Sequence, residues 1–245
     1  MASDVVLYES RENVAIITLN RPDRLNALNG EVCQRMVEIW RNFEASDDRV
    51  AIITGAGRAF TAGADITDGG EIWPWIPGVG VELRKPVIAA VTGLVVGGGV
   101  VLVQFADLAV IAEDAWLSYP EAKIGFTGGL IASMVARVPH KIAMEFLLVG
   151  EKMTAQRAYE IGFVNKVVPR AELMDSAMDY ARKLAANAPM VVETLKAFAG
   201  RTLPKGPTEL AGYARHMTER TFTSADLEEG LAAFAEKRTP TFRGS

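Results

Sequence analysis

VAIIT, at residues 14–18, occurs again at residues 50–54, and the similar VIAAVT follows at residues 87–92. Short runs rich in β-branched residues, bounded by Asn, Gly or Pro, are typical of buried strands. Between the first two runs, the segment 30–46 has apolar residues at helical spacing: Val32, Met36, Ile39, Trp40 and Phe43. This alternation predicts an α/β fold with a parallel sheet, to which residues 108–112 add a further strand.

The second half of the chain is predicted to be mainly helical. Helices are expected at residues 139–148, 154–162, 170–187 and 190–198. Gly150 is suited to end the first of these helices, and Thr154 is suited to cap the start of the second. The sequence therefore predicts an α/β core over residues 1–200.

Residues 201–245 are predicted to form a separate helical region. Thr223 and Asp226 have the spacing of a capping box ahead of the segment LEEGLAAFAEKR, in which Leu227, Leu231 and Phe234 form an apolar stripe. About forty residues are too few for a robust core of their own. We therefore expect this region to pack on the body or on a neighbouring subunit, as an oligomerisation element.

Composition limits the class of protein. The 245 residues are 49% hydrophobic, and 26 Lys and Arg against 30 Asp and Glu give a net charge of −4, which disfavours a disordered chain and a nucleic-acid partner. Cys33 is the only cysteine, which indicates a reducing compartment. The first ten residues lack the pattern of a secretory signal, and no apolar run is long enough to span a membrane. We expect a cytoplasmic protein with no membrane partner.

Several common catalytic motifs do not occur in the sequence. It lacks GxGxxG, GxxxxGK[ST], GxSxG, HExxH and CxxC, and its two histidines, His140 and His216, lie outside any motif. These absences disfavour nicotinamide binding through a dinucleotide motif, P-loop chemistry, a serine hydrolase and a zinc hydrolase. No metal site is expected.

Two glycine-rich segments at strand ends are the candidates for a binding site. The first is GAGRAFTAGADI at residues 55–66, and the second is Gly97-Gly98-Gly99 ahead of a helical segment. Small residues let a ligand approach backbone N–H groups closely, and amides at a helix N-terminus attract negative charge. Either loop alone is equally compatible with a tight turn. Together, two converging amides would form an oxyanion hole.

Glu121 is the candidate acid–base residue. It lies in SYPEAKIG at residues 118–125, an otherwise apolar and glycine-flanked stretch, where burial would raise the pKa of its carboxyl group. Taken alone, this glutamate is better explained by a solvated or salt-bridged loop position. Its combination with the two glycine loops favours catalysis.

Nearly the whole chain resembles the enoyl-CoA hydratase/isomerase (crotonase) superfamily. The matching segments are VAIITLNRPDRLNALNGEV, AFTAGADI, KPVIAAVTGLVVGGG, FADLAVIAEDAWLSYPEAKIG, LLVGEKMTAQRAYEIGFVNKVVP and GLAAFAEKR. The resemblance implies a spiral of ββα units with a helical C-terminal region, assembled as a homotrimer or homohexamer. It implies an acyl-CoA substrate, with coenzyme A entering as part of the thioester and no permanently bound cofactor.

The resemblance also implies roles for individual residues. The amides of Ala64 and Gly98 would hold the thioester carbonyl, beside Glu121. The residues implied to contact coenzyme A are Ala62, Gly63, Asp65 and Ile66 along its channel, Arg24 and Leu25 at its nucleotide end, and Phe234 and Lys237 from a neighbouring subunit. Thr218 stands where the family has an aromatic residue, which weakens the implied nucleotide pocket.

Val101 is the main departure from the family. Hydratases of this family have a glutamate two residues after the glycine triplet, so only Glu121 of the usual pair is present. One carboxylate can move a proton between two carbons of an enolate more easily than it can also activate water. We therefore expect double-bond isomerisation of an enoyl-CoA. The alternatives are an enoyl-CoA hydratase or dehydratase, a hydroxyaryl-acyl-CoA lyase, a thioesterase, and a catalytically inactive CoA-thioester binding protein.

The segment between Ile66 and Lys85 is shorter than in typical hydratases and contains Trp73 and Trp75. These tryptophans could form the wall of an acyl pocket, for a cyclic or aromatic acyl group, or could equally cap the core or a subunit contact.

Overall fold

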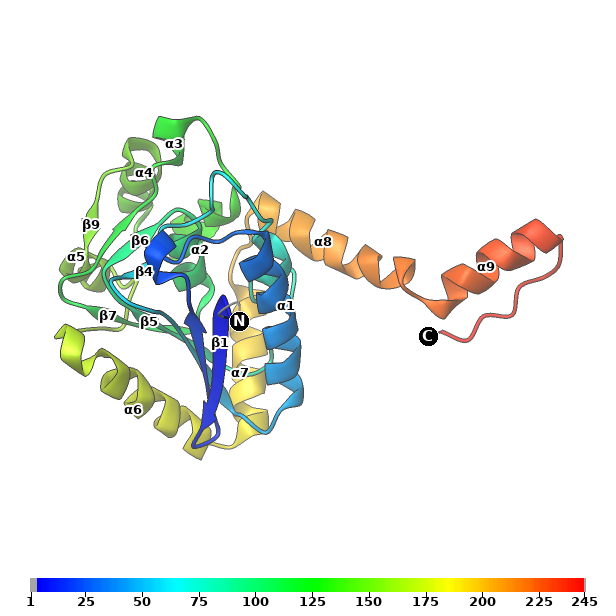
Figure 1. Ribbon diagram of the computed structural model, residues 1–245, viewed down its shortest axis with the longest axis horizontal. Helices are drawn as coiled ribbons and strands as arrows, with labels where there is room; N and C mark the ends of the chain where they lie inside the picture. The colour runs from blue at the N-terminus through cyan, green and yellow to red at the C-terminus, as the bar shows by residue number, and fades with distance from the viewer. Residues whose placement is uncertain (1–3, 245) are drawn as a thin grey trace.

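A six-stranded sheet forms the centre of the protein, whose computed structural model describes residues 4–244 (Figure 1). In spatial order its strands are β1 (Val6–Arg11), β2 (Val14–Leu19), β3 (Val50–Gly55), β5 (Val87–Val91), β7 (Leu108–Ala112) and β10 (Lys166–Val168). Only β1 runs antiparallel to its neighbour. The predicted parallel α/β core is thus confirmed.

The repeated pentapeptides lie side by side in this sheet. Val14 of β2 pairs with Val50 of β3, and every following residue pairs with its own copy as far as Thr18 and Thr54. Both strands are almost wholly buried, as their continuous apolar sequence predicts. A two-residue turn at Glu12 and Asn13, both with positive φ, joins β1 to β2.

A second sheet of four short strands lies next to the first. Its spatial order is β4 (Ala59–Thr61), β6 (Leu94–Val96), β8 (Trp116–Ser118) and β9 (Met153–Thr154). Strands β4, β6 and β8 each follow a long strand of the first sheet, and α2 (Gly98–Phe105) and α3 (Glu121–Ile124) begin just after β6 and β8. This arrangement is the ββα spiral that the resemblance implies.

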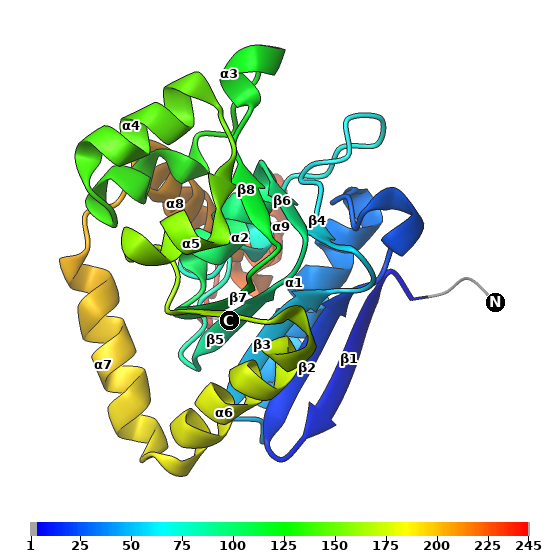
Figure 2. The same ribbon diagram turned by 90° about the vertical axis from the view of Figure 1, so that its left-hand side faces the viewer.

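Helices cover both faces of the large sheet. Helix α1 (Gly30–Ala45) begins where the Asn29 side chain accepts a hydrogen bond from the Val32 amide, and it buries the predicted apolar face. Helix α6 (Leu173–Ala186) contacts β2, β3, β5 and β7 (Figure 2). The remaining helical elements of the body are η1 (Pro22–Arg24), η2 (Trp73–Trp75), η3 (Leu130–Ala136), α4 (His140–Val149), α5 (Ala155–Glu160), η4 (Arg170–Glu172) and α7 (Pro189–Thr202).

Two of the predicted helix ends are confirmed. Gly150 ends α4 with a φ of 67°, and the Thr154 hydroxyl accepts a hydrogen bond from the Arg157 amide at the start of α5. At the C-terminus the predicted cap is displaced by one residue. Ser224, not Thr223, accepts the hydrogen bond from the Leu227 amide at the start of the last helix.

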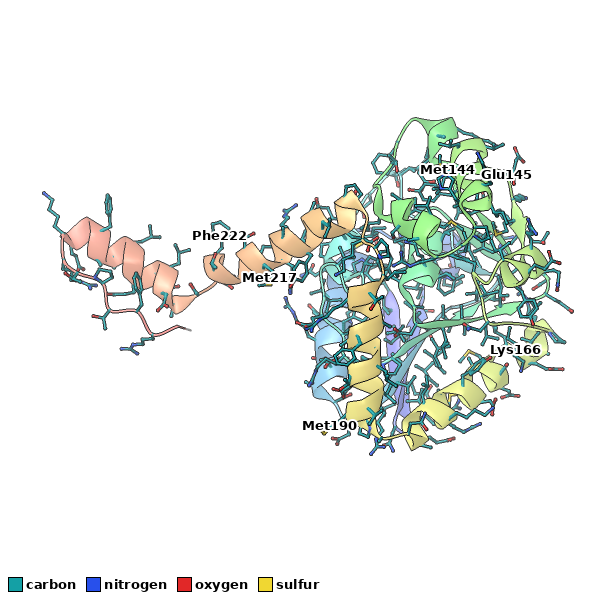
Figure 3. All side chains as sticks on the ribbon, turned by 180° about the vertical axis from the view of Figure 1, so that it is seen from behind. Met144, Glu145, Lys166, Met190, Met217 and Phe222 are labelled. Carbon is teal, nitrogen blue, oxygen red and sulfur yellow. The ribbon has the colours of Figure 1, made fainter. Side chains whose placement is uncertain are left out.

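The last two helices extend away from the body as an arm. Helix α8 (Pro207–Phe222), which lies in the region predicted to be helical but whose bounds were not predicted, contacts η2 and η3, and α9 (Ala225–Glu236) contacts α8 (Figure 1). Met217 and Phe222 are exposed on α8 beyond the body (Figure 3). Leu231 is 63% exposed on α9. Within residues 4–244, no helix is both long enough and apolar enough to cross a membrane.

Candidate active site

The two glycine-rich loops lie against each other. A Cβ atom on Gly63 would lie 2.5 Å from the carbonyl oxygen of Val96 and 3.3 Å from the amide nitrogen of Gly98. A Cβ on Gly98 would lie 3.8 Å from the Ala64 nitrogen. Gly63 has a φ of 85°, so both its conformation and its surroundings require glycine. The fold therefore brings together the loops that the sequence singled out.

The amides of Ala64 and Gly98 have no hydrogen-bond acceptor among residues 4–244, whereas their neighbours do. The Gly63 amide donates to the Thr61 hydroxyl, the Asp65 amide to the Leu28 carbonyl, and the Gly97 amide to the Ser118 carbonyl. Gly98 is the first residue of α2, where an amide has no partner within its helix. Two adjacent unpaired N–H groups can stabilise negative charge on a carbonyl oxygen.

The loop that carries Ala64 is fixed by hydrogen bonds from a segment earlier in the chain, residues 21–28. The Leu28 amide donates to the Gly63 carbonyl at 2.8 Å, and Arg21 Nη1 donates to Asp65 Oδ2 at 3.2 Å and to the Ala27 carbonyl at 2.6 Å. Hydrogen bonds from Thr67, and then from Arg21, lower the pKa of the Asp65 carboxyl to about 2. The Asp65 carboxylate thus makes intramolecular bonds that fix the loop. Arg21 was not among the predicted site residues, because its contact with a residue 44 positions away leaves no local signal in the sequence.

Glu121 lies next to the glycine triplet as the first residue of α3. It is 8% exposed, and its Oε2 atom has no hydrogen-bond partner in the described part of the chain. A Cβ on Gly97 would lie 2.8 Å from Glu121 Oε1, so the carboxyl group rests against the residue that precedes Gly98. Burial raises the pKa of Glu121 to about 7. Near neutral pH this group can both accept and donate a proton.

Val101 is buried on α2, three residues after Gly98. Its side chain cannot carry a proton, and it occupies the place of the carboxylate that the resemblance implied for hydratases. Glu121 is therefore the buried carboxyl group adjoining the triplet.

The other candidate residues are distributed unevenly around this centre. The Ala62 amide donates to the Leu25 carbonyl at 2.9 Å, which brings the turn with Leu25 and the exposed Arg24 beside the first loop. Ile66 is 92% exposed at the edge of this loop. Phe234 and Lys237 lie at the end of α9, on the arm that extends from the body, so they do not reach the site of their own chain (Figure 1).

The two tryptophans have different environments. Trp75 is completely buried in the core, and Trp73 packs against α8, where the Arg215 guanidinium lies 4.9 Å from its ring centre. Their neighbour Ile72 reaches the glycine triplet. Ile72 Cδ1 would lie 3.2 Å from a Cβ on Gly98.

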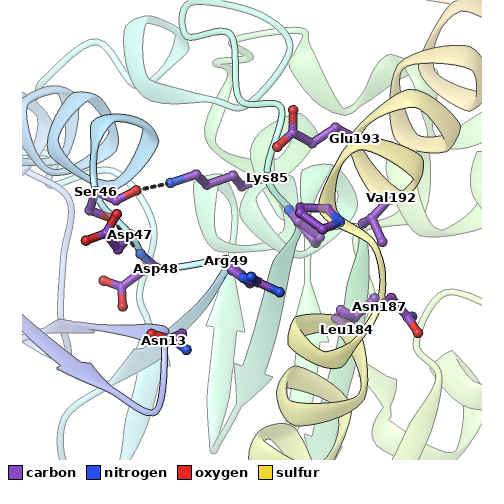
Figure 4. A pocket seen from close by; sticks show the side chains of 12 residues that line it. Asn13, Ser46, Asp47, Asp48, Arg49, Lys85, Leu184, Asn187, Val192 and Glu193 are labelled. Atoms are coloured by element: carbon purple, nitrogen blue, oxygen red, sulfur yellow. Dashed lines mark hydrogen bonds between the residues drawn. The ribbon is translucent and has the colours of Figure 1, made fainter.

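A separate cavity of about 350 Å³ lies between the end of α1 and the connection from α6 to α7 (Figure 4). It is lined by Asn13, Ser46, Asp47, Asp48, Arg49, Lys85, Pro86, Leu184, Asn187, Pro189, Val192 and Glu193. Lys85 donates to the Phe43 and Ser46 carbonyls, and Arg49 donates to the Ala185 carbonyl. Both cations are thus engaged by the protein itself, and none of the candidate residues lines this cavity.

Comparisons with known proteins match this chain over almost its full length. A family model described as "Enoyl-CoA hydratase/isomerase" matches residues 9–73 and 80–245. The chain is 33% identical to (E)-benzylidenesuccinyl-CoA hydratase of Thauera aromatica, over 98% of this chain and 99% of that one. It is 38% identical to a carnitinyl-CoA dehydratase of Escherichia coli, over 93% and 94% of the two chains. The solved structure of carnitinyl-CoA hydratase from Mycobacterium avium superposes with a TM-score of 0.78, at 33% identity and full coverage of both chains.

Proposed function

Because this chain belongs to the enoyl-CoA hydratase/isomerase family, we propose that it converts an acyl-CoA thioester through an enolate, with Glu121 as its only carboxylate acid and base. The observation that carries this proposal is the buried Glu121 carboxyl group, which has an unpaired oxygen and a pKa raised to about 7, next to the unpaired Gly98 amide. The Ala64 and Gly98 amides bind the thioester oxygen in this reaction.

The reaction that we propose is migration of a double bond. The Glu121 carboxylate removes a proton from the α-carbon of a β,γ-enoyl-CoA, and the electron pair moves into the thioester carbonyl to give a dienolate. The two amides stabilise the resulting oxyanion. The Glu121 carboxylic acid then returns the proton to the γ-carbon, which leaves an α,β-enoyl-CoA. One carboxyl group suffices because it is restored at the end of each turnover.

Hydration or dehydration is the second candidate, and the names of the relatives favour it. The similar chains from Thauera aromatica and Escherichia coli are a hydratase and a dehydratase. Addition of water needs a group that positions and activates it while a proton reaches the α-carbon. In this chain Val101 stands where the hydratases of the family have the first glutamate, two residues after the glycine triplet, which favours isomerisation as the main reaction.

Coenzyme A follows the first loop in this proposal. Ala62, Gly63 and Ile66 line its channel, Arg24 and Leu25 lie at its nucleotide end, and Asp65 keeps the loop in place. Phe234 and Lys237 of a neighbouring subunit complete the binding site in a homotrimer or homohexamer. The exposed apolar residues of the arm support this assembly. The single cysteine supports a reducing compartment such as the cytoplasm.

Two measurements test the proposal. Butyryl-CoA in deuterium oxide should exchange its α-protons, and Glu121→Gln should lower this rate by about 10²–10⁴-fold while butyryl-CoA still binds. Exchange that is unchanged in Glu121→Gln would refute the role of this residue. The products formed from 3-hexenoyl-CoA, separated by chromatography, should be mainly 2-hexenoyl-CoA. A hydroxyacyl-CoA as the main product would favour hydration instead.

Val101→Glu tests the reason for this preference. The new carboxylate should raise the ratio of hydration to isomerisation, whereas the neutral Val101→Gln variant should not. Because a buried glutamate is costly, circular dichroism must first show that the variant is folded. An unchanged product ratio in a folded Val101→Glu variant would show that the missing carboxylate does not decide the reaction.

A further inference from the structure

We propose that Ile72 limits the size of the acyl group at the α-carbon, and that helix α8 keeps Ile72 in this position through Trp73. This inference rests on the proposed function, because it takes the Ala64 and Gly98 amides as the site of the thioester carbonyl. The sequence suggested Trp73 and Trp75 as the wall of an acyl pocket. In this inference, Ile72, which precedes them, has that role.

The space beside Gly98 is bounded by two apolar side chains and one free amide. A Cβ on Gly98 would lie 3.2 Å from Ile72 Cδ1, 3.3 Å from Leu28 Cδ1 and 3.8 Å from the Ala64 nitrogen. Both methyl groups are therefore near van der Waals contact with a point next to the carbonyl site. In this inference, an acyl group whose oxygen is held by the two amides has its α-carbon close to this point. The terminal methyl of Ile72 thus sets how much substitution the α-carbon can carry.

The position of Ile72 depends on contacts that lie on the other side of its segment. Element η2, which follows directly, contacts both α1 and α8. Trp73 Nε1 donates to Glu71 at 3.0 Å, and the Arg215 guanidinium of α8 lies 4.9 Å from the Trp73 ring centre. A Cβ on Gly212 of α8 would lie 2.5 Å from Val79 Cγ1 and 3.5 Å from Trp73 Cε3. Helix α8 therefore covers Trp73 at close range.

These contacts connect the arm with the acyl site. Ile72 is covalently joined to Trp73, and Trp73 is held between its own segment and α8. A change that loosens Trp73 from α8 leaves Ile72 free to withdraw from Gly98. Trp73 and Arg215 are therefore positioning residues, and Ile72 is the residue that determines specificity.

The test compares two saturated thioesters that differ only in bulk at the α-carbon: butyryl-CoA and cyclohexanecarbonyl-CoA. Their Kd values are measured by calorimetry with the full-length protein, and α-deuteration is followed for both. In Ile72→Ala, the affinity for cyclohexanecarbonyl-CoA relative to butyryl-CoA should rise by about tenfold or more. Ile72→Val, which removes one methyl group, should give a smaller rise. Leu148→Ala, at an exposed position on α4, is the matched control and should leave the ratio unchanged.

The positioning role has its own variants. Arg215→Ala should raise the same affinity ratio, by less than Ile72→Ala does, and Arg215→Lys should restore the original ratio by replacing the cation over the ring. Arg41→Ala, at an exposed position on α1, is the control. A purely structural role of Arg215 would weaken both thioesters equally and leave the ratio unchanged, which would refute this part of the proposal.

The outcomes separate this inference from the proposed function. An unchanged affinity ratio in Ile72→Ala, with Glu121-dependent α-deuteration still present, refutes the inference and leaves the function standing. Failure of butyryl-CoA to bind the original protein refutes both, whereas weak or absent binding of cyclohexanecarbonyl-CoA to the original protein is what the inference expects. If Ile72→Ala does not fold, the conservative Ile72→Val variant decides, and an unchanged ratio there overturns the assignment.

Discussion

Glu121 is expected to reduce the stability of the protein while it provides the acid–base chemistry. The pKa of its carboxyl group rises from 4.5 to about 7 because burial disfavours the charged form. This difference corresponds to about 3 kcal/mol between the two protonation states, which partial solvent access at the site reduces to about 2 kcal/mol. The folded protein binds this proton more tightly than the unfolded chain. Its free energy of unfolding therefore falls as the pH rises from about 4.5 to about 7.

Glu121→Gln removes this pH-dependent cost, since glutamine stays neutral. Between pH 5 and pH 8 the variant should gain about 2 kcal/mol in free energy of unfolding relative to the original protein. Urea unfolding at both pH values, at one protein concentration, measures the difference. Glu145→Gln on α4 is the matched control, because Glu145 is exposed (Figure 3). At pH 5 the two Gln variants and the original protein should be nearly alike.

The same variant links stability to activity. At pH 8 Glu121→Gln should be the more stable protein and the slower one, with its α-proton exchange reduced by about 10²–10⁴-fold. The stability difference between Glu121→Gln and the original protein could instead be the same at pH 5 and pH 8. The pKa of the Glu121 carboxyl group would then not be raised by burial in the folded protein. That result would refute the electrostatic basis of the site.

Three further variants test the contact beside Glu121, the loop that carries Ala64, and the arm. Gly97→Ala should slow α-proton exchange by at least about tenfold and cost about 1–3 kcal/mol in unfolding free energy, because φ is 53° and the new Cβ would lie 2.8 Å from Glu121 Oε1. A folded Gly97→Ala variant with full exchange would contradict this geometry. Arg21→Gln should weaken butyryl-CoA binding about fivefold by releasing Asp65, which corresponds to about 1 kcal/mol for a half-buried ion pair, and calorimetry that finds equal Kd values would argue against a positioning role. Leu231→Glu should shift the protein toward monomers in light scattering, since this side chain is 63% exposed on α9, and an unchanged mass would remove α9 from the subunit contact.

The elements that the sequence predicts well are those whose own residues determine them. The long strands are continuous β-branched runs, and α4 and α5 are delimited by Gly150 and Thr154. The strands of the second sheet have only two or three residues, too few for a periodic pattern. Helix α8 lies in the region that was predicted to be helical, and two residues mark its start. Pro207 is its first residue, and the Glu209 carboxylate accepts a hydrogen bond from the Gly206 amide.

The residues of the candidate site also differ in how well the sequence predicts them. Its glycine loops and Glu121 are recognisable because only small residues and one carboxyl group fit such positions, and the fold brings them into contact. The pairing of Arg21 with Asp65 and the approach of Ile72 to Gly98 depend on segments far apart in sequence. Local patterns do not encode such contacts. The role of Trp73 could not be predicted from the sequence either, because α8 lies more than a hundred residues further along the chain.

The identical pentapeptides of β2 and β3 have a consequence for how the chain folds. Over the five residues of VAIIT, strand β1 could form the same antiparallel side-chain contacts with either copy, and only the sixth pair would differ, because β3 has Gly55 where β2 has Leu19. The turn at Glu12 and Asn13 removes this ambiguity, because positive φ at both positions matches a two-residue hairpin. Such a hairpin closes within about 1–10 μs, long before a contact across the intervening helix α1 is favoured. The early closure of this turn thus favours the pairing of β1 with β2 over a pairing with β3, whose pentapeptide is identical.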